Sequence, residues 1–102
     1  MTHRFLPQAR AEFDRAVDWY DAQQPPMGDD FINEVYATVQ RMVGGPQAFP
    51  RANRPPAGRE VCVAKVHRFE YLVYYEVTAT ELLILCVTHG KRGRHPWRQR
   101  LP

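Results

Sequence analysis

Four basic side chains have the chemistry that acid–base cleavage of a phosphodiester needs. His89 is a histidine, whose reference pKa of ~6.5 suits proton transfer close to neutral pH. Lys65, Arg68 and Arg92 are cations of the kind that stabilise a phosphate in the transition state. Since no partner at a fixed spacing accompanies His89, a structural histidine at a strand end, bonded to backbone, explains it as well. The residues alone leave both interpretations open.

Other chemical motifs are missing from the sequence. It has no Gly-rich phosphate loop, no Gly-x-Ser-x-Gly elbow and no His-Glu-x-x-His helix. Cys62 and Cys86 fall on the first and third of three consecutive predicted strands, about 9–10 Å apart, which exceeds the ~7 Å reach of a disulfide. We therefore expect two reduced thiols, no metal site and no cofactor.

The C-terminal end, residues 90–102, reads GKRGRHPWRQRLP and contains five basic residues and no acidic one. Aromatic and cationic side chains interleaved in this way are typical of binding hot spots. A solvated, flexible end, or a tryptophan folded back on the sheet, are the alternatives. The functional interpretation predicts a target-binding surface made of Lys91, Arg92, Arg94, Trp97, Arg98 and Arg100.

Charge is unevenly distributed along the 102 residues, whose formal net charge is +3. Residues 1–50 contain four basic and seven acidic side chains, whereas residues 51–102 contain ten basic and four acidic ones. A basic half suits an acidic protein segment or a polyanion, although a mildly basic protein without such a partner has the same composition.

Three strands are predicted in residues 59–89, where REVCVAKVHRF, EYLVYYEVT and ATELLILCVTH each alternate in hydrophobicity and are rich in β-branched and aromatic residues. The short links around His67 and Ala79 have the length of hairpin turns. The pattern therefore predicts a three-stranded antiparallel meander.

Two helices are predicted ahead of these strands. A short extended piece over residues 3–6 ends at Pro7, a residue that suits the first position of a helix. The apolar stripe from Ala9 to Tyr20 follows helical spacing, and Pro25 and Pro26 end it. A second helix begins near Gly28 and stops before the turn-rich connector at residues 44–58.

These elements predict an α+β fold: a short N-terminal strand, an antiparallel helical hairpin packed on one sheet face, then the meander. We expect one domain over residues 1–102, with 90–102 as a basic tail. Without a signal peptide or a membrane-length apolar run, a cytoplasmic protein is expected. The predicted core contains Phe13, Tyr20, Phe31, Val35, Val39, Val73, Leu83 and Leu85.

Residues 67–76 (HRFEYLVYYE) and 82–92 (LLILCVTHGKR) resemble the closing half of the RelE/ParE superfamily of toxins from type II toxin–antitoxin pairs. The spacing of Ala9 and Phe13, the pair Trp19 and Tyr20, and residues 28–35 are similar to the two helices of that family. The sequence departs from the family at Glu70, where a proline usually precedes the tyrosine.

The resemblance implies one of two activities. Ribosome-dependent mRNA endonucleases of this superfamily typically have a second strand crowded with Lys and Arg, and an acid–base Tyr or His-Tyr close to the C-terminus. Here that strand offers only Lys65, and no tyrosine follows Tyr75. The pattern looks more like the ParE branch, which inhibits DNA gyrase by protein contact without catalysis. The implied partners are a cognate antitoxin and gyrase, or the ribosome and mRNA in the alternative. Operator DNA would be reached only through the antitoxin, and no membrane is involved. A third hypothesis is a degenerate toxin that only binds its antitoxin.

Overall fold

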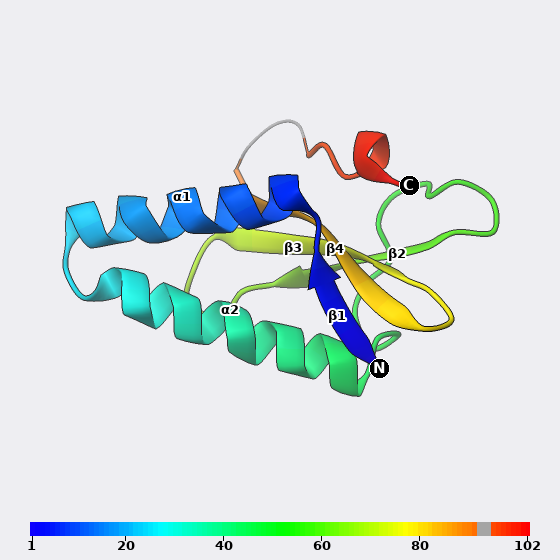
Figure 1. Cartoon of the computed structure of the whole chain (residues 1–102), viewed down its shortest axis with the longest axis horizontal. Helices are drawn as coiled ribbons and strands as arrows, with labels where there is room; N and C mark the ends of the chain where they lie inside the picture. The colour runs from blue at the N-terminus through cyan, green and yellow to red at the C-terminus, as the bar shows by residue number, and fades with distance from the viewer. Residues whose placement is uncertain (92–94) are drawn as a thin grey trace.

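The computed structural model describes residues 1–91 and 95–102. Its strands form one four-stranded sheet in the order β1-β4-β3-β2, with two helices over one face (Figure 1). The elements are β1 (Thr2–Phe5), α1 (Pro7–Gln23), α2 (Met27–Gly44), β2 (Glu60–Lys65), β3 (Tyr71–Val77), β4 (Glu81–His89) and the short 3-10 helix η1 (Arg98–Arg100). The α+β fold, the helical hairpin and the meander are confirmed.

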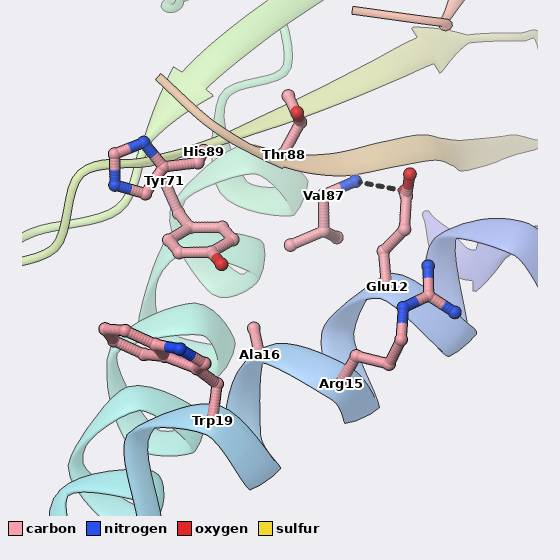
Figure 2. Close-up of a pocket in the computed structure, with 8 residues that line it drawn as sticks. All are labelled: Glu12, Arg15, Ala16, Trp19, Tyr71, Val87, Thr88 and His89. Atoms are coloured by element: carbon pink, nitrogen blue, oxygen red, sulfur yellow. Dashed lines mark hydrogen bonds between the residues drawn. The ribbon is translucent and has the colours of Figure 1, made fainter. Parts of the chain in front are cut away.

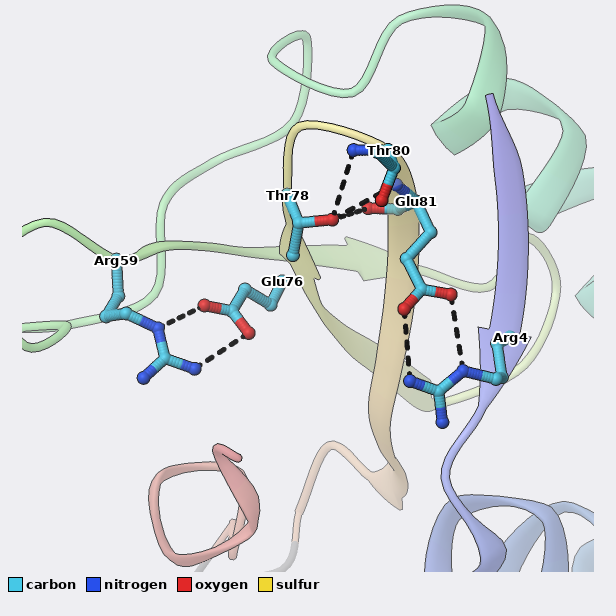
Figure 3. A network of polar contacts seen from close by, with 6 residues as sticks. All are labelled: Arg4, Arg59, Glu76, Thr78, Thr80 and Glu81. Atoms are coloured by element: carbon cyan, nitrogen blue, oxygen red, sulfur yellow. Dashed lines mark hydrogen bonds and ion pairs between the residues drawn. The ribbon is translucent and has the colours of Figure 1, made fainter.

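The N-terminal strand makes the sheet mixed, because β1 runs parallel to β4 while β3 is antiparallel to both of its neighbours. The Arg4 guanidinium on β1 forms a bidentate ion pair with the Glu81 carboxylate at the start of β4, with N–O distances of 3.2 and 3.0 Å (Figure 3). Thr78 closes the β3–β4 turn, since its hydroxyl donates to the Glu81 carbonyl at 2.8 Å. Both contacts fix the register in which β4 leaves the turn.

A hydrogen bond holds the turn between the two helices. The Asp21 carboxylate, in the last turns of α1, accepts from the Gly28 amide at 2.8 Å. A Cβ at position 28 would lie 2.3 Å from the Asp21 Oδ1, so only glycine allows this approach. Asp29 and Asp30 follow in the first turn of α2, where carboxylates complement the positive end of the helix dipole.

The first core cluster lies between the helices and the sheet. Phe13 and Phe31 pack there with their ring centroids 6.0 Å apart, and Val73 and Tyr75 come from β3. Of the eight predicted core residues, Tyr20 is the exception, because it is only partly buried at the end of the helical hairpin. The prediction that the helices cover one sheet face is correct.

A second core cluster covers the opposite sheet face, where Trp97 and Leu101 of the C-terminal end pack on β3 and β4. The β3–β4 register shifts between Tyr74 and Tyr75, which pair with Cys86 and Ile84 and leave Leu85 as an extra residue. Leu83, Leu85 and Cys86 therefore all face this cluster. Both faces of β4 are buried, which explains its continuous apolar sequence.

Cys62 and Cys86 are free thiols, as predicted. They belong to different clusters, Cys62 to the first and Cys86 to the second, so the sheet itself separates them. Burial raises the pKa of the Cys62 thiol and keeps it protonated. Among the described helices, none combines the length and the apolar character needed to cross a membrane.

Candidate functional site

The edge of β4 loses its neighbouring strand halfway along its length. β1 pairs with β4 only as far as Phe5 opposite Ile84, and the Leu6 amide then donates to the Ile84 carbonyl at 2.9 Å. The chain turns away into α1 at Pro7. Beyond Ile84, β4 has backbone N–H and C=O groups on the edge that β1 has left. These groups need other hydrogen-bond partners, because a buried backbone group without a partner costs free energy.

An ion pair between α1 and η1 satisfies two of these groups. Glu12, 7% exposed, accepts from the Val87 amide at 3.0 Å. Arg100 donates to the Leu85 carbonyl at 2.9 Å and to both Glu12 oxygens at 2.8 and 2.9 Å. The side-chain hydrogen bond with Glu12 raises the pKa of Arg100, so the guanidinium stays charged at neutral pH. The Glu12–Arg100 pair thus caps β4 where β1 ends.

A groove opens beside this pair, between α1 and the last residues of β4 (Figure 2). It consists of two cavities of about 200 and 320 Å³ that share Trp19, Tyr71 and His89 in their walls. We call it the α1–β4 groove and define it by Arg15, Trp19, Tyr20, Tyr71, Val87 and His89. One end is aromatic and the other carries the Arg15 guanidinium.

His89 lies in the groove wall with its ring held in place. The ring is 5.3 Å from that of Tyr71 at an interplanar angle of 76°, an edge-to-face contact. Its Nδ1 accepts from the Lys91 amide at 3.1 Å, so the neutral imidazole carries its proton on Nε2. A histidine bonded to backbone at a strand end is the structural interpretation that the sequence left open.

Lys65 and Arg68 do not converge on His89. Lys65 pairs with Leu72 while His89 pairs with Tyr71, and neighbouring strand positions point to opposite faces. Arg68, in the turn after β2, lies 3.6 Å from Glu34 and 3.9 Å from Asp30 of α2. Arg92, the fourth member of the predicted set, lies outside the described residues.

The residues of the predicted target-binding surface occupy different environments. Trp97 is 7% exposed and stacks on Tyr74 with ring centroids 6.0 Å apart, while Arg100 is half of the Glu12–Arg100 pair. Arg98 is exposed, with its guanidinium 4.7 Å from the Trp97 ring centroid and a hydrogen bond to the Asn53 carbonyl at 2.9 Å. Lys91 is exposed, and Arg92 and Arg94 lie outside the described residues.

Sequence reasoning missed Glu12, although a signal for it exists. Glu12 lies one turn after Ala9 and one turn before Ala16, so a carboxylate interrupts the apolar stripe of α1 at a position that faces the sheet. A buried carboxylate requires a cation or several donors. Its partner Arg100 is 88 residues away in the chain, and nothing local to either residue pairs the two.

Comparisons with known proteins agree with this fold. Residues 4–94 match the protein-family model described as ParE toxin of type II toxin-antitoxin system, parDE. A solved structure described as the chromosomal ParDE TA system from P. aeruginosa is similar, with a TM-score of 0.73 and 19% sequence identity over 87% of this chain and 95% of that chain. A comparison with curated protein sequences finds no match. Because the family model covers most of its length, the chain belongs to the ParE toxin family of type II parDE toxin–antitoxin systems.

Proposed function

We propose that this ParE-family toxin arrests growth by binding DNA gyrase through protein contact, and that an antitoxin of ParD type neutralises it. Membership of the ParE family carries this proposal, and the parDE family description implies the ParD-type partner. The toxin acts in the cytoplasm, where gyrase is found, and reaches operator DNA only through the antitoxin.

The arrangement of the basic residues supports contact rather than catalysis. General acid–base chemistry needs a base and cations within hydrogen-bond reach of one substrate. Lys65 and His89 point to opposite faces of the sheet, and Arg68 is engaged with the acidic side chains of α2. His89 has its Nδ1 occupied by a backbone amide. The described residues of the endonuclease alternative therefore form no common site.

The surface proposed for gyrase is the exposed part of the basic C-terminal end. Trp97 fixes this end on the sheet, and Arg100 anchors it to α1, so these two act by positioning. Arg98 stacks on Trp97 and has its orientation set by the Asn53 carbonyl, which lowers the entropy that it loses on binding. Lys91 and Arg98, which are exposed, supply charge for an acidic partner surface, and we assign Arg92 and Arg94, which lie outside the described residues, to the same charge by sequence alone.

Expression of variants in cells tests this proposal. His89→Ala should leave growth arrest intact, whereas the double variant Lys91→Glu/Arg98→Glu should relieve it. Arg41→Glu, a charge reversal in the last turn of α2, is the matched control and should remain toxic. Arrested cells should have inhibited supercoiling, an induced DNA-damage response and intact messages. Cleavage of ribosome-bound mRNA that disappears with His89→Ala would replace the gyrase proposal with the endonuclease.

A further inference from the structure

The sheet face opposite the helices carries an exposed lysine at the end of β2. Val61 and Val63 of β2 belong to the second core cluster, so Lys65, two residues further along the strand, points to the same face. Lys65 is exposed, and its amine donates to the Phe69 carbonyl at 3.4 Å. That contact is neutral, so the lysine charge remains at the surface of this face.

Two arginines lie near the other end of β2. The Asn53 carbonyl accepts from Arg98 at 2.9 Å, and Arg54 is the next residue along the connector. Ala52, just before them, packs in the second cluster, which places this part of the connector beside the same sheet face. Both arginines are exposed. We call this surface the basic sheet face and define it by Arg54, Lys65 and Arg98.

Two carboxylates of the strands lie on this side of the sheet, and both are neutralised (Figure 3). Glu76 pairs with Leu83 of the second cluster, and Glu81 lies two residues before Leu83 on β4. Glu76 accepts two hydrogen bonds from Arg59, and Glu81 accepts two from Arg4. None of the three cations of the basic sheet face forms an ion pair with a described residue. Their charge therefore has no partner within the described part of the chain.

The aromatic side chains on this face are buried. Trp97 is 7% exposed and Tyr74 is 9% exposed. The large apolar side chains that the structure describes as exposed are elsewhere: Trp19 and Tyr36 on the helices, and Met1 ahead of β1. A protein hot spot usually presents an aromatic anchor, and single-stranded nucleic acid stacks its bases on exposed rings. Exposed charge without such an anchor suits the phosphate backbone of a duplex instead.

We infer that the basic sheet face binds the phosphate backbone of duplex DNA without reading its sequence. A guanidinium donates paired hydrogen bonds to phosphate oxygens, and Arg98 is already oriented by the Asn53 carbonyl and the Trp97 ring. Backbone contacts carry no sequence information, so recognition of the operator remains with the antitoxin. The inferred binding adds to the proposed contact with gyrase and does not depend on it.

The spacing of the cations along β2 fits a duplex. The Ala52 amide donates to the Val61 carbonyl at 2.8 Å, which places the two arginines near Val61. Lys65 is four residues further along β2, and four extended residues cover about 13 Å. This length is comparable with the ~12 Å width of the major groove of DNA. The cations at the two ends of β2 can therefore reach phosphates on both strands.

A fluorescence anisotropy titration of a labelled DNA duplex with the purified full-length toxin tests the inference. Because each neutralised phosphate contributes about −0.9 to the slope of log affinity against log salt, the native slope should be about −3 or steeper. Arg54→Gln/Lys65→Gln/Arg98→Gln should make the slope less steep by about one for each cation removed. The same variant should bind the duplex at least about tenfold more weakly at low salt.

A second triple variant is the matched control. Arg10→Gln/Arg15→Gln/Arg41→Gln removes the same net charge from the two helices, which lie on the other side of the sheet. It should keep the salt slope and change the affinity less than about threefold. The substituted side chains of both variants are exposed, so both should keep the native unfolding temperature.

Four results would overturn the inference. Equal losses in the two triple variants would mean that binding follows net charge alone. Absence of duplex binding by the native toxin at low salt would also overturn it, and inhibition of gyrase by that toxin would leave the proposed function standing. Tighter binding to single-stranded RNA than to the duplex would indicate an mRNA site instead. If the basic-sheet-face variant loses gyrase inhibition but keeps native duplex binding, the face contacts protein and not DNA.

Discussion

At the scale of single residues, the Glu12–Arg100 pair shows how a side chain can replace a strand. Arg100→Ala would leave the buried Glu12 carboxylate without its cation and the Leu85 carbonyl without its donor. Breaking a buried pair from one side typically costs about 3–5 kcal/mol, so urea denaturation should show a loss of that size. Arg98→Ala, two residues earlier and exposed, should change the free energy of unfolding by less than about 0.5 kcal/mol. Equal stability of the two variants would mean that the pair does not hold the C-terminal end.

The exposed Arg4–Glu81 pair should be visible in the titration of the Glu81 carboxyl. The hydrogen bond and the charge of Arg4 lower the pKa of the Glu81 carboxyl below its usual value. The folded pKa then lies below the unfolded one, so the stabilisation is present above the unfolded pKa and is lost as pH falls through the folded pKa. Arg4→Gln should raise the Glu81 pKa towards its ordinary value in an NMR titration. An unchanged Glu81 titration curve would contradict the pairing in solution.

At the scale of elements, the C-terminal end is part of the core. Trp97 and Leu101 cover the second cluster, which contains Leu83, Leu85 and Cys86. Removal of residues 95–102 would expose this apolar face and also leave Glu12 unpaired. We expect the truncated chain to unfold or aggregate at 25 °C, as monitored by circular dichroism and light scattering. A truncated chain that melts at the temperature of the full chain would show that the second cluster needs no cover.

Truncation is therefore a poor test of the gyrase-binding surface. A loss of growth arrest after truncation would not separate a missing contact from a missing fold. Point reversals at Lys91 and Arg98 separate the two, because both side chains are exposed. The control for such variants is an unchanged unfolding temperature.

The helices and the meander were predictable because their signals are local. Helical spacing from Ala9 to Tyr20 and alternation from Tyr71 to Val77 fix which side of each element is apolar. The parallel pairing of β1 with β4 was not predictable in this way, since it joins residues about 80 apart in sequence. The cover provided by Trp97 was left open, because the surrounding residues have no periodic pattern that marks a buried face.

The candidate site was predictable only in part. His89 stood out by residue type, and the structure places it in the wall of the α1–β4 groove. The groove itself was not expected, because nothing local in the sequence places Trp19 of α1 beside Tyr71 and His89 of the sheet. Tyr20, predicted to be buried, is only partly buried, because it lies in the wall of this groove.

At the scale of the whole molecule, the α1–β4 groove and the basic C-terminal end have different positions. The α1–β4 groove lies between the first helix and the end of β4, whereas the C-terminal end packs over the opposite face of the sheet. An antitoxin that neutralises the toxin by covering Arg98 must therefore reach the sheet face opposite the helices, as expected of a segment that folds as it binds.

A supercoiling assay with purified gyrase shows whether the toxin inhibits this enzyme by contact. The native toxin should inhibit gyrase in the absence of ribosomes, and its antitoxin should relieve the inhibition at equimolar amounts. Lys91→Glu/Arg98→Glu should lose most of the inhibition while keeping its unfolding temperature, and His89→Ala should retain it. Unimpaired supercoiling with the native toxin, together with cleavage of mRNA when ribosomes are added, would show that the toxin is an mRNA endonuclease and not a gyrase inhibitor.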